Sequence, residues 1–159
     1  MIARTLPVLL LLTALSANGA PGPTCPSPVA EAESLYSRDH DFAFRSPVSL
    51  KTRVTPELRA ALSAEYARCG AVQEECIDAD VWTGQNGLVP TRAPHFSLMS
   101  ELNGVARVAV ESTLEQDGAP TLVTRVSVSL TREESSGCWA IQDLTLVDSS
   151  SLLSLLTTN

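Results

Sequence analysis

The apolar residues of this chain recur at helical spacing in its first half and alternate in its second half. Ser27-Pro28 and Thr55-Pro56 each supply a hydroxyl that can cap a helix and a proline suited to the first helical position. The first predicted helix continues to about Asp39, and the second is expected to stop at Gly70. One face of the second helix forms a mostly apolar stripe: Leu58, Ala61, Leu62, Glu65, Tyr66 and Cys69. Glu65 is the only charged residue of this stripe and is expected at its edge.

The alternating second half predicts strands over residues 105–114, 122–130 and 138–146, with a shorter one around 95–99. Asp117-Gly118 and Ser136-Gly137 are turn signals between the longer strands. The leucines of residues 152–156 are expected to close the chain as a short helix or turn. Because helices precede strands, the predicted fold is α+β and cone-shaped, with two N-terminal helices packed on a curved antiparallel sheet.

Residues 1–20 have the three parts of a secretory signal peptide: Arg4, an apolar run over residues 8–15, and small residues up to Ala20. That run is far shorter than the roughly 20 residues that span a bilayer, so no membrane segment is expected after cleavage. Residues 21–27 are then a flexible lead-in, and residues 28–157 form a single domain. The expected location is the periplasm or the medium.

Four cysteines lie beyond the signal peptide: Cys25, Cys69, Cys76 and Cys138. An even number in an exported chain indicates two disulfides. Cys69 and Cys76 are the best-placed pair, which leaves Cys25 for Cys138. The sequence alone allows three connectivities, and a reactive thiol is the alternative. The spacing is not that of a zinc site, so no metal is expected.

The sequence is acidic, with a net charge of −7 that becomes −8 once Arg4 is removed. An acidic surface repels phosphate backbones, so nucleic acid is not an expected partner. The charge otherwise indicates solubility.

The irregular residues 71–95 supply most of the polar side chains that would face a pocket. Asp78 and Asp80 could bind a cation or act as an acid and a base, although the ligand pattern of a calcium loop is missing and turn capping is the alternative. Of the two histidines, His40 is expected to stabilise a helix end, and His95 could enter the pocket. The candidate pocket residues are Tyr36, Asp78, Asp80, Trp82, Gln85 and His95.

No catalytic residue and no cofactor is predicted. The serine-rich segments lack the Gly-x-Ser-x-Gly pattern of a nucleophile elbow, and no glycine-rich phosphate loop is present. The aromatic side chains of Tyr36, Tyr66, Trp82 and Trp139 suit either a core or a pocket wall.

Several motifs occur in a distinctive order: Leu35-Tyr36, residues 54–62, residues 78–85, residues 137–144 and residues 151–153. Together they resemble a family of exported bacterial domains of unknown function with a nuclear-transport-factor-2-like fold. The resemblance covers most of residues 28–157. In that family a proline follows the second aspartate and an aspartate follows the glutamine, where this sequence has Val81 and Asn86. The resemblance implies a cone-shaped α+β fold and no particular activity, since that fold hosts isomerases, dehydratases, binding modules and inhibitors.

Two functional hypotheses follow. The first is an exported, non-enzymatic binding module for a protein partner or a small apolar ligand, of which an immunity or inhibitor protein is one version. The second is a small enzyme or lipophilic-ligand carrier that uses the cone cavity, with carboxylates from Asp78 or Asp80 and a hydrogen-bond donor from Tyr36 or His95. A binder can have a filled cone and an exposed apolar patch, whereas an enzyme needs an acid or base inside a cavity. The oligomeric state stays open.

Overall fold

The computed structural model describes residues 24–44, 46–50, 53–71, 77, 80–85, 88, 90–115 and 121–158. Its α-helices and strands confirm the predicted α+β class, and the structure also contains a short 3-10 helix, η1, that the sequence did not predict. The elements are α1 (Pro28–Arg38), η1 (Pro47–Leu50), α2 (Pro56–Ala71), β1 (His95–Leu102), β2 (Val105–Leu114), β3 (Leu122–Arg132), β4 (Trp139–Thr145) and α3 (Leu152–Thr158).

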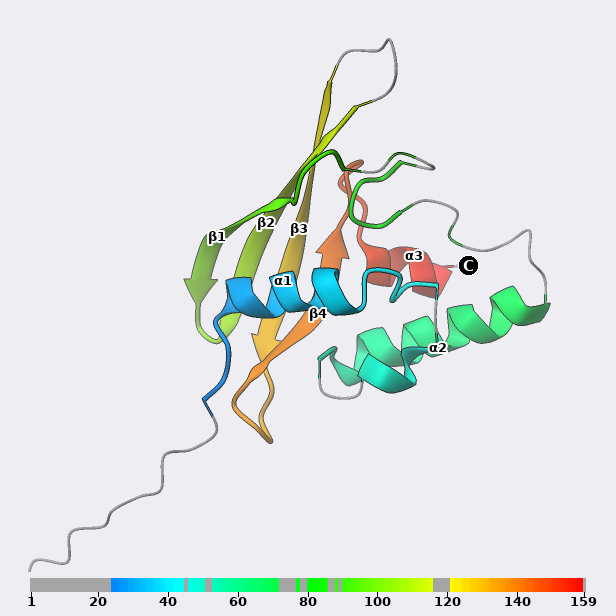
Figure 1. Cartoon of the computed structure of the whole chain (residues 1–159). Helices are drawn as coiled ribbons and strands as arrows, with labels where there is room; N and C mark the ends of the chain where they lie inside the picture. Colours follow the sequence, from blue (N-terminus) through cyan, green and yellow to red (C-terminus); the bar gives the residue numbers. More distant parts are fainter. Residues whose placement is uncertain are drawn as a thin grey trace, which may run out of the picture.

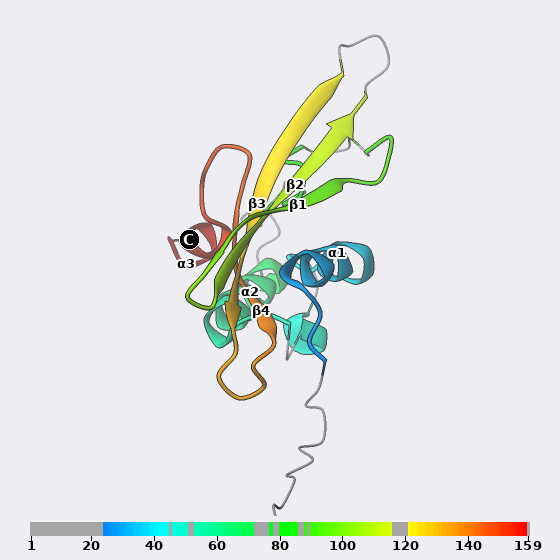
Figure 2. The same ribbon diagram turned by 90° about the vertical axis from the view of Figure 1, so that its left-hand side faces the viewer.

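The four strands form one antiparallel sheet in the order β1-β2-β3-β4. The register shifts between Leu98 and Ser100 on β1, and again between Ser129 and Leu130 on β3. Such bulges increase the local twist of a sheet. Figures 1 and 2 show the sheet curved, with α1 lying across one face and α2 beyond β4.

The core lies between that face and the helices. Inward residues of β2 and β3 alternate with outward ones, as the sequence predicts, so that Arg107 and Glu111 lie on the opposite face from Val108. The buried cluster joins sheet and helix residues: Ala32, Leu35, Leu58, Leu62, Val108, Val110, Val126, Val128, Leu130, Ile141 and Leu144. The predicted packing of helix on sheet is therefore confirmed.

Both predicted helix starts are confirmed. The Ser27 hydroxyl accepts a hydrogen bond from the Ala30 N–H at 3.2 Å, and the Thr55 hydroxyl accepts one from the Leu58 N–H at 3.3 Å. The predicted stop at Gly70 is wrong, because α2 continues to Ala71. Gly70 does not adopt the positive φ of a glycine cap, and a glycine inside a helix costs only about 1 kcal/mol.

Glu65 is buried, and not at the edge of the apolar stripe as predicted. Its carboxylate accepts hydrogen bonds from Arg68 Nε (3.1 Å) and from the Ile77 N–H (3.1 Å). These donors offset the desolvation of the carboxylate. Tyr66, which the pattern placed on the same stripe, turns instead to the surface.

The β4 edge of the sheet is paired with residues 53–55. The Thr55 N–H donates to the Ile141 carbonyl, and the Ile141 N–H donates to the Arg53 carbonyl, both at 2.8 Å. The Arg53 guanidinium then binds Glu31 (3.0 Å) and Asp39 (2.5 Å) of the α1 region. Arg53 thereby ties α1 to the β4 edge.

A disulfide joins Cys25, ahead of α1, to Cys138 at the start of β4, which confirms that predicted pair. Cys69 is also disulfide-bonded, and its predicted partner, Cys76, lies outside the described residues. In the part of the chain that the structure describes, no helix has the length and hydropathy of a membrane span. The predicted division into leader, lead-in and domain stays a prediction.

Candidate functional site

Two of the predicted pocket residues, Tyr36 and Trp82, belong to an aromatic cluster at the C-terminal end of α1, and a third, Asp80, contacts it. The Tyr36 ring meets the rings of His40, Trp82 and Phe96 edge to face, with centroids 4.7, 5.3 and 5.8 Å away. Phe42 contacts Trp82 from another side, at 5.9 Å. Trp82 is fully buried, so these rings fill the space between α1 and β1.

Polar contacts fix the geometry of this cluster. His40 Nε2 lies 3.3 Å from Asp80 Oδ2, and Asp80 Oδ1 accepts a hydrogen bond from the Trp82 N–H at 2.8 Å. The indole Nε1–H of Trp82 donates to the His40 carbonyl at 3.0 Å. These three contacts hold residues 80–82 against the end of α1.

The remaining predicted pocket residues lie elsewhere. His95 is exposed on β1, opposite Glu111. The Gln85 N–H donates to the Thr83 hydroxyl, and Asp78 lies outside the described residues. The structure adds His40 to the cluster, although the sequence pattern assigned it only to a helix end. No helical spacing gives this contact, because α1 ends at Arg38 and His40 lies in the turn after the C-cap residue Asp39.

Burial raises the pKa of the Tyr36 hydroxyl above its usual value, and the negative charge of Asp80 raises it further. The folded state therefore holds the phenolic proton more tightly than the unfolded chain does. The resulting stabilisation is present below the ordinary tyrosine pKa, and it is lost as the pH rises through the pKa of folded Tyr36.

Spectrophotometric titration tests this environment. Tyr36 and Tyr66 are the only tyrosines, so a Tyr66→Phe variant isolates Tyr36. We expect phenolate absorbance to appear above pH 10, and at lower pH when Asp80→Asn is added, because that change removes the nearby negative charge. If Asp80→Asn left the pKa of Tyr36 unchanged, the placement of Asp80 near the Tyr36 hydroxyl would be contradicted.

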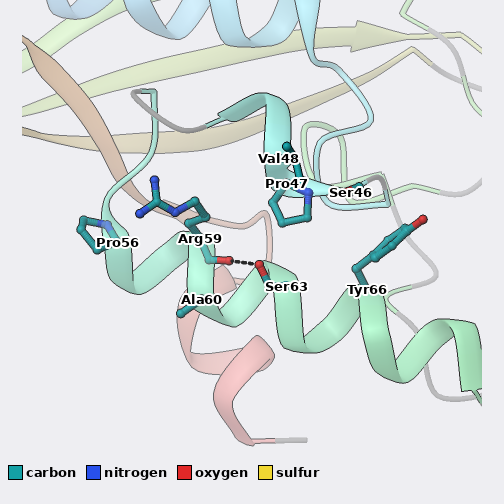
Figure 3. Close-up of a pocket in the computed structure, with 8 residues that line it drawn as sticks. All are labelled: Ser46, Pro47, Val48, Pro56, Arg59, Ala60, Ser63 and Tyr66. Carbon is teal, nitrogen blue, oxygen red and sulfur yellow. Dashed lines mark hydrogen bonds between the residues drawn. The ribbon is translucent and has the colours of Figure 1, made fainter.

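Of the cluster, Phe42 lines one of three hollows found in the described residues, whereas Tyr36, His40, Trp82 and Phe96 line none of them. The largest, of about 540 Å³, is an open groove between η1 and α2 (Figure 3). A second, of about 440 Å³, lies between α1, Arg53 and the start of β4, and a third, of about 370 Å³, lies beside Phe42 and Leu50. Among the described residues, no group of three or more histidine, cysteine or acidic side chains is placed to hold a metal ion.

The groove combines apolar and hydroxyl side chains. Val48 of η1 is 66% exposed and Tyr66 of α2 is 49% exposed. Figure 3 shows Arg59 and Tyr66 on either side of Ser63, whose hydroxyl donates to the Arg59 carbonyl at 2.8 Å. The lining residues are Ser46, Pro47, Val48, Pro56, Arg59, Ala60, Ser63 and Tyr66. Sequence reasoning missed this site because the apolar stripe placed Tyr66 inside and no pattern predicted η1.

Comparison of the sequence with models of known protein families gave no match, and comparison with curated proteins gave none either.

Proposed function

We propose that this chain is an exported binding module that receives a segment of a partner protein in the groove between η1 and α2. The observation that carries the proposal is the exposure of Val48 and Tyr66 on the two walls of one open hollow. Tyrosine is enriched among the residues that dominate protein interfaces, because its ring buries a large area while its hydroxyl forms hydrogen bonds.

The partner segment is expected to present apolar side chains to the proline, valine and tyrosine of the groove. The hydroxyls of Ser46 and Ser63 suit hydrogen bonds to polar groups of the same segment. Phe44, two residues before Ser46 of the groove lining, is also half exposed. Clustered exposed apolar side chains of this kind mark interaction sites more often than isolated ones do.

Two further parts of the proposal concern family and location. We infer membership of the exported family with a nuclear-transport-factor-2-like fold, supported by helices packed on a curved antiparallel sheet. We infer a periplasmic or secreted location, supported by the Cys25–Cys138 disulfide, since such bonds persist in oxidising compartments. An immunity or inhibitor role is one form that protein binding would take.

Site-specific photocrosslinking in intact cells tests the groove. A benzophenone amino acid at position 48 should give one discrete adduct with a partner protein, and adding Tyr66→Ala should reduce that adduct. The same amino acid at Val123, an exposed position on β3, is the matched control and should not give the adduct. No adduct from position 48, or equal adducts from both positions, would contradict docking in the groove.

A second candidate function is the binding of a small apolar ligand at the aromatic cluster, with or without catalysis. It is favoured by the hydroxyl of Tyr36 and the imidazole of His40 beside apolar rings. In a Trp139→Phe variant, Trp82 is the only tryptophan and can transfer energy to N-phenyl-1-naphthylamine bound nearby. Saturable transfer would support this candidate, and its absence would remove the lipophilic-carrier version.

A further inference from the structure

Strand β1 is the first strand in the sheet order. Among the described residues, β2 is the one strand paired with it, and none lies on its other edge. Seven of its eight residues are exposed, all except Phe96. By contrast, the β4 edge is paired with residues 53–55. An open strand edge presents free N–H and carbonyl groups, which favour pairing with another strand.

The same edge carries large apolar side chains. Leu98, Met99 and Leu102 are 48%, 58% and 72% exposed. Val105, the cross-strand neighbour of Leu102, is half exposed as well. Natural edge strands are commonly protected by lysine, proline or shortness, whereas β1 has eight residues and contains no lysine or proline. Its bulge near Met99 and the carboxylate of Glu101 are the two features of β1 that oppose strand addition.

We propose that β1 pairs with β1 of a second copy of this chain, antiparallel and about a two-fold axis between Leu98 and Met99. The two four-stranded sheets would then form one continuous sheet. This inference concerns a different surface from the groove and does not depend on the proposed function.

The register between β1 and β2, which shows the sheet face on which each β1 residue lies, supports this axis. Because of the bulge near Met99, Phe96 and Glu101 lie on the inner face with Val110 and Ala106, and Ser97 and Ser100 lie on the outer face with Ala109 and Arg107. Opposed residues in a continuous sheet must share a face. An axis between Leu98 and Met99 satisfies that rule for three pairs between the two copies: His95–Leu102, Phe96–Glu101 and Ser97–Ser100. Met99, which lies in the bulge and has no partner on β2, is then opposite Leu98.

The charges of the strand are compatible with this pairing and not with a parallel one. The antiparallel arrangement places the two Glu101 carboxylates at opposite ends of the interface, whereas parallel pairing would bring them together. Directly opposed like charges destabilise a strand pair. Each copy is acidic as a whole, so screening by salt is expected to strengthen the dimer.

A mixture of two variants, each with one added cysteine, tests the register. Ser97→Cys protein and Ser100→Cys protein, mixed and oxidised, should form a covalent dimer, because these positions are opposite each other across the axis. Neither variant alone should form it efficiently, because residue 97 is not opposite residue 97 of the second copy. The described native cysteines are not free to compete. Crosslinking that is equal in the mixture and in each variant alone would overturn this register.

Sedimentation equilibrium tests the dimer itself. The wild-type chain should reach the mass of a dimer with rising concentration, and Leu98→Lys should raise the dissociation constant at least about tenfold, since the ammonium would face the apolar Met99 of the second copy. Val123→Lys, on an exposed position of β3, is the matched control and should dimerise like the wild type. A wild-type monomer at every concentration, or a Leu98→Lys variant that dimerises unchanged, would overturn the proposal.

Discussion

Replacing Cys25 and Cys138 together by serine should lower the free energy of unfolding by up to about 4.8 kcal/mol. The bond closes a loop with a sequence separation of 113 residues, and a cross-link over so long a loop removes much of the conformational entropy of the unfolded chain. It also holds residues 24–27 beside β4, where Pro26 and Cys138 both line the hollow next to Arg53.

Urea denaturation of the wild type and of the double serine variant measures this effect. The slope of the free energy of unfolding against urea concentration should be steeper for the double variant. A steeper slope shows that the unfolded chain has become more expanded, as the entropic account requires. A matched control is Ser136→Ala, which removes the hydrogen bonds of the Ser136 hydroxyl with the Cys138 N–H and with Glu133 in the same turn but leaves the disulfide in place. A double variant within about 1 kcal/mol of the wild type would contradict the role assigned to this bond.

Trp82→Ala is the second change with a large expected effect, a loss of about 3 to 5 kcal/mol. Trp82 is fully buried against Tyr36 and Phe42, and its Nε1–H binds the His40 carbonyl. Truncation leaves a cavity and an unpaired carbonyl in the same place. The cavity and the unpaired carbonyl both lower the free energy of unfolding.

Trp139 remains in this variant and reports unfolding by its fluorescence, because it is the only other tryptophan and is buried. Trp82→Phe serves as the matched variant, since it removes the hydrogen bond but keeps an aromatic ring. It should lower the free energy of unfolding clearly less than Trp82→Ala does. If the free energy of unfolding of Trp82→Ala were within about 1 kcal/mol of the wild-type value, the cluster would not be part of the core.

The fold could be predicted from local sequence features because each feature acts within a few residues. The Ser-Pro and Thr-Pro signals specify the starts of α1 and α2, and the alternation of residues 105–114 matches β2 at both ends. The end of α2 was less predictable, since Gly70 can either stop a helix or continue it, and the packing around the helix decides.

The candidate site could be predicted only in part, because its contacts join distant residues. Tyr36, Asp80 and Trp82 were singled out by type, but the contact between His40 and Asp80 spans 40 positions, and no periodicity encodes it. Glu65 was misplaced for a similar reason, since its burial depends on the Ile77 N–H, twelve residues away. The groove depends on how η1 lies against α2, which is a tertiary arrangement.

The dissociation constant of the crosslinked partner tests the proposed function most directly. Tyr66→Ala should raise it at least about tenfold, because the groove loses its largest exposed ring, whereas Tyr36→Phe, in the aromatic cluster, should leave it unchanged. Equal binding by the wild type and Tyr66→Ala, with weaker binding by Tyr36→Phe, would contradict the groove and assign recognition to the cluster.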